Sequence, residues 1–143
     1  MAPNFAAVSP GEKLPPLSVK GKFKLAKEDS FDDTSFVWTG ILAAQSMGLR
    51  TYPEFGDGAA SYGRYYWRGF VDGVSGTYFT EAIVPVLTHE DPRYFTLGHG
   101  NFFKRFGYAL SRVVLTKTDS KGTSFNISEV GGNALEATLA NLY

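Results

Sequence analysis

Hydrophobic residues recur at helical spacing along most of this chain, and turn-forming residues separate the segments in which they do so. The pattern predicts helices over residues 18–30, 34–47 and 59–91, and two more that begin after Asn101 and Asn126. Residues 1–17 hold four prolines and show no periodicity, so we expect an extended N-terminal arm. We therefore predict an all-α protein, in which residues 18–143 form a single-domain bundle of about five helices.

The longest predicted helix carries glycines along one stripe and a proline near its end. Gly69, Gly73 and Gly76 lie four and then three residues apart, which places them on the same side of a helix. Each interior glycine costs about 1 kcal/mol relative to alanine, so we expect a neighbouring helix to pack closely there. Pro85 lacks an amide hydrogen and crowds the carbonyl group of Glu81, which predicts a kink between these two residues.

Two shorter predicted helices carry enough apolar residues to indicate which of their faces are buried. Residues 34–47 are apolar on most sides, which is typical of a helix enclosed by its neighbours. In the helix after Asn101, the residues Phe102, Phe106 and Val113 share one face, which we predict to be buried.

Charge and composition exclude several classes of function. Lys and Arg total 14 and Asp and Glu total 14, so the formal net charge is zero. This balance gives no support to nucleic-acid binding and no overall attraction to anionic lipid. The chain has no cysteine, which excludes disulfides and thiolate ligands. We find no phosphate-binding, dinucleotide-binding or serine-nucleophile motif, and we predict no cofactor and no metal.

The sequence leaves the cellular location open. No apolar run reaches the roughly 18 residues that a transmembrane helix needs. The first residues lack the basic and apolar regions of a signal peptide. Stripes of small residues drive helix association within membranes, so membrane association stays an alternative.

Ionisable residues gather between His89 and Tyr94, and these are the strongest candidates for chemistry. Adjacent residues of a regular helix cannot all face one ion, and no paired-histidine spacing supports a metal site. We predict instead that Asp91 and Arg93 pair and stabilise a helix end. The candidate polar cluster comprises His89, Glu90, Asp91, Arg93, Arg112 and Glu129. A ligand-binding or hydrolase-like site around His89, Asp91, Arg93 and Arg112 is the alternative interpretation.

Four motifs together resemble a family of uncharacterised exported bacterial proteins. They are PEFGDGAASYG, TEAIVPVLTHEDPRYF, YALSRVVLTKTDSKG and FNISEVGGN, in that order along the chain. The resemblance covers residues 22–143 and implies an exported protein of the periplasm or cell envelope, with no assigned activity. Members of the family continue beyond the equivalents of Leu142 and Tyr143, which implies that the present chain is a shortened form.

These observations favour a non-enzymatic helical envelope protein that acts through helix packing, with itself as a homo-oligomer or with a protein partner. Two alternatives stay open: the ligand-binding or hydrolase-like domain, and a membrane-associated helical protein. An exposed apolar patch or an oligomer favours the first interpretation. A concave pocket in which a histidine faces a carboxylate favours the second.

Overall fold

The computed structural model describes residues 7–143, so the first six residues of the predicted N-terminal arm lie outside the described residues. Helices make up 64% of the described chain, which confirms the prediction of a helix-rich protein. The five longest are α1 (Val19–Ser30), α2 (Asp33–Gly48), α3 (Ala59–Tyr78), α5 (Phe102–Val114) and α6 (Ile127–Ala140). Four of these helices begin after a residue whose side chain caps the first turn. The caps of α1, α2, α5 and α6 are Ser18, Asp32, Asn101 and Asn126, respectively.

Two small sheets accompany the helices, and the all-α prediction missed them. In the first, β1 (Ala7–Val8) runs parallel to β3 (Tyr94–Phe95), so the N-terminal arm pairs with the body of the protein. In the second, β4 (Leu115–Thr118) lies between β2 (Glu90–Asp91) and β5 (Thr123–Phe125), with antiparallel pairing on both sides. Strands of two to four residues are too short to show an alternating pattern in the sequence.

The segment after α3 changes its helical geometry just before Pro85. A π-helical segment, η2 (Phe79–Ile83), follows α3 and leads into the short helix α4 (Val84–Thr88). The amide of Val84 donates to the carbonyl of Phe79, five residues back, as in a π-helix. His89 then ends α4 with a left-handed backbone (φ 57°), and the chain enters β2.

The glycines of α3 differ in how closely other residues approach them. A Cβ atom at Gly76 would lie 3.3 Å from Glu136 Cγ on α6, and one at Gly69 would lie 3.9 Å from Thr39 Cγ2 on α2. A Cβ atom at Gly73 would have no heavy atom within 4 Å, so close packing does not explain that glycine.

Among the glycines of the helices, Gly132 on α6 has the closest neighbours. A Cβ atom at Gly132 would lie 3.0 Å from the backbone N and Cα atoms of Thr80, in η2. The absence of a side chain at Gly132 therefore lets the backbones of α6 and η2 approach each other.

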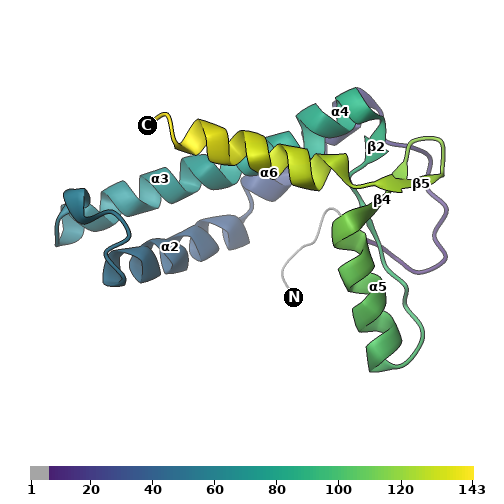
Figure 1. Ribbon diagram of the computed structural model, residues 1–143, viewed down its shortest axis with the longest axis horizontal. Helices are drawn as coiled ribbons and strands as arrows, with labels where there is room; N and C mark the ends of the chain where they lie inside the picture. Colours follow the sequence, from purple (N-terminus) through teal and green to yellow (C-terminus); the bar gives the residue numbers. More distant parts are fainter. Residues whose placement is uncertain (1–6) are drawn as a thin grey trace.

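The helices form a layer from which one helix projects. Figure 1 shows α2 and α6 lying beside α3, whereas α5 points away from all three. The buried apolar core is small and includes Leu25, Ala26, Ala43, Tyr65 and Ala82. The helix α1 packs on η2, and α6 packs across α3, η2 and α4.

Two predictions about burial are wrong. The free side of α2 is exposed, including Val37, Ile41 and Trp38, which is 59% exposed. On α5, Phe102, Phe106 and Val113 are also exposed, although their spacing indicated a buried face. Helical spacing shows which residues share a face, but the elements packed around a helix decide whether that face is covered.

No helix in the described part of the chain combines the length and the hydropathy needed to cross a membrane.

Candidate functional site

Glu90 is a buried carboxylate that caps the start of α6. Only 1% of this residue is exposed. Its Oε1 atom accepts a hydrogen bond from the Ile127 amide at 3.1 Å, and Oε2 accepts one from the Ser128 amide at 2.8 Å. The Ser128 hydroxyl donates to the same Oε2 atom. A negative charge at these free amides is favourable because it satisfies them and complements the helix dipole.

Asp91 and Arg93 form a two-point ion pair. Arg93 Nε lies 2.9 Å from Asp91 Oδ1, and Arg93 Nη2 lies 2.6 Å from Oδ2. The hydrogen bonds to Asp91 raise the pKa of Arg93. Arg93 Nη2 also donates to the carbonyl of Pro15 at 2.7 Å, which attaches the N-terminal arm to this pair.

Lys22 is an additional buried cation that the sequence reasoning missed. It is 2% exposed, and its Nζ atom donates to Asp119 Oδ2 at 2.8 Å and to the carbonyl of Pro85 at 3.0 Å. These contacts join α1 to α4 and to the turn between β4 and β5. Its position in the sequence could have indicated that it is buried. Lys22 precedes Leu25 and Ala26 by three and four positions, so it shares a helix face with these two buried apolar residues.

The other members of the predicted polar cluster lie apart from these ion pairs. His89 and Glu129 are exposed, and Glu129 Oε1 accepts from Asn133 Nδ2 at 3.1 Å. Arg112 places its guanidinium 5.0 Å from the centre of the Tyr108 ring. The six candidate residues therefore serve several separate contacts, and no hydrogen bond joins a histidine side chain to a carboxylate in residues 7–143.

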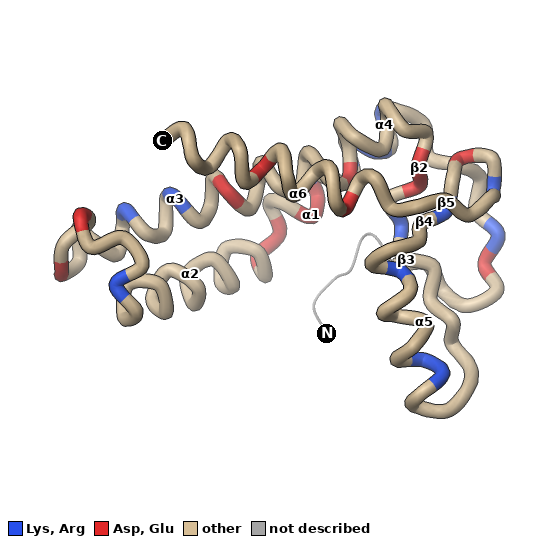
Figure 2. Tube along the Cα trace, in the orientation of Figure 1, with Lys and Arg blue, Asp and Glu red and all other residues tan. Residues whose placement is uncertain are grey.

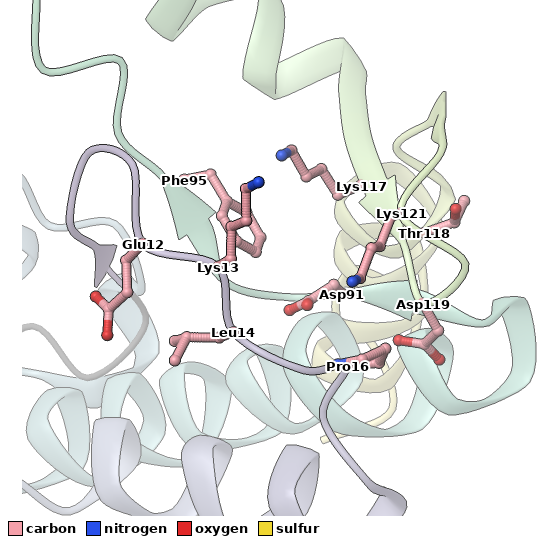
Figure 3. A pocket seen from close by; sticks show the side chains of 10 residues that line it. All are labelled: Glu12, Lys13, Leu14, Pro16, Asp91, Phe95, Lys117, Thr118, Asp119 and Lys121. Carbon is pink, nitrogen blue, oxygen red and sulfur yellow. The ribbon is translucent and has the colours of Figure 1, made fainter.

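A pocket of about 310 Å³ lies beside the Asp91–Arg93 pair. The N-terminal arm forms one wall, and β3, β4 and the β4–β5 turn form the others (Figure 3). Its lining residues are Glu12, Lys13, Leu14, Pro16, Asp91, Phe95, Lys117, Thr118, Asp119 and Lys121. The volume suits a small ligand, and the lining combines an aromatic ring and aliphatic side chains with charged groups.

Three lysines line this pocket, together with the carboxylates of Glu12, Asp91 and Asp119. In Figure 3 the amines of Lys13 and Lys117 lie at the same end of the pocket, beside Phe95, and the amine of Lys121 points toward Asp91 and Asp119. Lys117 Nζ lies 4.5 Å from the centre of the Phe95 ring. Within the described chain, none of these lysines forms an ion pair.

The carboxylates of the pocket are mostly neutralised by other groups. Asp91 pairs with Arg93, and Asp119 pairs with Lys22. Glu12 is then the remaining carboxylate of the lining, and its side chain points away from the lysine amines (Figure 3). The pocket is therefore suited to an anion.

Glu81, in η2, is a largely buried carboxyl group with a raised pKa. Burial raises the pKa of Glu81 to about 8, with further contributions from Asp29 on α1 and from Glu129. Glu81 Oε2 is buried and has no hydrogen-bond donor within reach. The carboxyl groups of Glu81 and Asp29 can share a hydrogen bond when one of them carries a proton, which favours the protonated form.

Among residues 7–143, no three histidine or carboxylate side chains are placed to hold a metal ion. Comparisons of the chain with family models, with curated proteins and with solved structures gave no match.

Proposed function

We propose that the protein is a non-enzymatic envelope protein that acts through helix packing, and that a second copy of the chain covers the free side of α2. The observation that carries this proposal is the exposure of Trp38 next to the exposed side chains of Val37 and Ile41 on α2. A helix that is apolar on most sides is stable in water when other elements surround it. Here α3 covers one side, through Tyr62 and the stacked pair of Phe36 and Phe70.

The charges at the ends of α2 favour a twofold arrangement. Asp32 and Asp33 lie at its N-terminal end, and Arg50 follows its C-terminal end. An antiparallel contact between the α2 helices of two copies brings these opposite charges together at both ends. Such an interface is closed and self-complementary, as in most homodimers.

Light scattering on the eluate of a size-exclusion column tests this proposal. The full chain should elute as a dimer, and Trp38→Glu should make it a monomer because the charge would be buried at the interface. Phe103→Glu is the matched control, since it places the same charge on an exposed aromatic position of α5. A wild-type monomer at high concentration, or a dimer that Trp38→Glu leaves intact, contradicts the proposal.

The proposed envelope location rests on the resemblance of the four sequence motifs to exported bacterial proteins. Fractionation of cells that express the complete natural gene tests it. Recovery of the protein in the periplasmic or membrane fraction supports the location, and recovery with cytoplasmic markers contradicts it.

We further propose that α3, η2 and α4 act as one central helix that bends ahead of Pro85. Supporting this, the three elements follow one another without an intervening residue. The chain contains no cysteine, so spin labels attached to Ala60→Cys and Leu87→Cys report a single distance. Pro85→Ala should lengthen that distance by relieving the bend. An unchanged distance would contradict the proposal that Pro85 bends the helix.

A second candidate function is the binding of a small organic anion in the lysine-lined pocket. It is supported by the ammonium groups of Lys13 and Lys117 beside the Phe95 ring and by that of Lys121, none of which forms an ion pair within residues 7–143. Titration calorimetry with citrate and with inorganic phosphate at low salt tests this function. Lys117→Gln should abolish the heat of binding, whereas Lys20→Gln, on the exposed side of α1, should leave it unchanged. Equal binding by both variants contradicts a site in the pocket.

A further inference from the structure

The C-terminal half of α5 presents its apolar side to solvent and its polar side to the protein. Tyr108 and Arg112 are half-buried, and the Tyr108 hydroxyl donates to the carbonyl of Phe95 at 2.6 Å. On the other side, Leu110 and Val114 are exposed, together with Phe103, which is 78% exposed. An amphipathic helix of a water-soluble domain normally has the reverse orientation.

The exposed apolar residues are concentrated at the projecting end of the molecule. The first turns of α5 carry Phe102, Phe103 and Phe106, and all three rings are exposed. Phe102 contacts the other two, with ring centres 5.6 Å from Phe103 and 5.8 Å from Phe106. This end of α5 lies far from the layer formed by α2, α3 and α6 (Figure 1). The aromatic cluster is therefore accessible to a large surface.

The same helix is positively charged, which the zero net charge of the chain conceals. Lys104, Arg105 and Arg112 lie in α5, and the helix contains no Asp or Glu. Figure 2 shows basic but no acidic positions along α5, whereas acidic residues occur on the other parts of the molecule. Lys104 and Arg105 are exposed and lie between the phenylalanines in sequence. Such a helix combines the two properties that hold interfacial helices on anionic bilayers.

We propose that α5 docks on the surface of an anionic lipid bilayer. The rings of Phe102, Phe103 and Phe106 enter the boundary between headgroups and acyl chains, and Lys104 and Arg105 contact the lipid phosphates. A bilayer fits better than a protein partner because exposed cations lie next to exposed aromatic rings on this helix, which matches the negative surface and the apolar interior of an anionic bilayer. The free side of α2, by contrast, has no cation within the helix, so it lacks the electrostatic part of this attraction.

Co-sedimentation of the full chain with lipid vesicles tests the proposal. The protein should bind vesicles of equal parts phosphatidylglycerol and phosphatidylcholine and should not bind pure phosphatidylcholine. High salt should weaken the binding by screening the charges. Phe103→Ser should weaken it about tenfold, because the aromatic ring no longer leaves water. Leu87→Ser is the control, since Leu87 is similarly exposed, on α4, and should not contact the bilayer.

Fluorescence locates the inserted residue. Trp38 and Trp67 lie on α2 and α3, so brominated lipids should leave the wild-type emission unchanged. In Phe103→Trp, the same lipids should quench the added emission. Equal binding to neutral and anionic vesicles, no loss with Phe103→Ser, or no quenching in Phe103→Trp overturns the proposal. Conversion of a dimer to a monomer by Phe103→Ser, without vesicle binding by the wild type, would show that the face is a protein interface instead.

Discussion

Lys22 Nζ lies 2.8 Å from Asp119 Oδ2, and this ion pair joins residues that are 97 positions apart in the chain. The ammonium group also binds the carbonyl of Pro85, so it connects α1, α4 and the β4–β5 turn. Asp119 is partly hydrated, with 25% of its side chain exposed, whereas Lys22 is almost fully enclosed. Loss of the lysine therefore leaves the buried carbonyl of Pro85 without its hydrogen-bond donor, which water does not replace there.

Lys22→Met should lower the free energy of unfolding by about 3 kcal/mol, because it breaks a buried ion pair from one side. Chemical denaturation followed by circular dichroism measures this loss. Lys24→Met is the matched control on the same helix, since its pair with Glu28 is long (3.6 Å) and exposed. That control should change the stability by less than about 1 kcal/mol. Equal effects of the two substitutions would contradict a special role for Lys22.

Glu90→Gln should lower the free energy of unfolding by about 1–3 kcal/mol, because the charged acceptor at the start of α6 becomes neutral. Urea denaturation provides the measurement. Glu129→Gln lies in the first turn of the same helix but is exposed, so its effect should stay below about 1 kcal/mol. A larger loss in the Glu129 variant would contradict Glu90 as the main cap.

Two glycines should respond in opposite directions to the same substitution. Gly132→Ala places a methyl group 3.0 Å from the backbone of Thr80 and should cost about 1–3 kcal/mol. Gly73→Ala meets open space within a helix and should stabilise the protein by about 0.5–1 kcal/mol. Thermal unfolding of both variants tests the pair of predictions. Destabilisation by Gly73→Ala would show that a neighbour packs there after all.

The stability of the protein should fall as the pH rises toward 8. The pKa of Glu81 is raised to about 8 in the folded state, from a usual value of 4.5, so the folded protein holds a proton that the unfolded chain releases within this range. The slope of stability against pH is therefore negative between these values and levels off above them. The total loss is on the order of a few kcal/mol.

Glu81→Gln removes this titration and serves as its test. Because the folded-state pKa of Glu81 is about 8, the variant should be more stable than the wild type above pH 8. Between about pH 5 and pH 8, where Glu81 of the wild type stays protonated only in the folded state, the stability of the variant should change less than that of the wild type. Asp33→Asn, at the exposed N-terminal end of α2, is a control that keeps the wild-type slope. Identical pH profiles for Glu81→Gln and the wild type would contradict a protonated Glu81.

The local features of the fold were predictable from neighbouring residues. Asn101 and Asn126 cap α5 and α6 because their side chains reach amides three positions ahead. The pairing of Asp91 with Arg93 could also be anticipated, since the two residues are two positions apart and carry opposite charge. All of these interactions act over one turn of the chain, so the sequence contains both partners side by side.

The candidate pocket and the buried ionic contacts depend on residues that are far apart in sequence. Nothing near Lys22 indicates Asp119 as its partner, and nothing near Phe95 indicates that Lys13 of the arm closes the pocket. The two small sheets bring these segments together through β1–β3 and β2–β4 pairing.

The sequence by itself determined where α1, α2, α5 and α6 begin, because the side chains that cap them act locally. It also determined which residues of α5 share a face, because helical spacing depends on the backbone alone. Only the tertiary structure decided that Phe103 and Trp38 face solvent rather than a core. The physical reason is that burial depends on which elements pack around a helix, and helical periodicity carries no information about those neighbours.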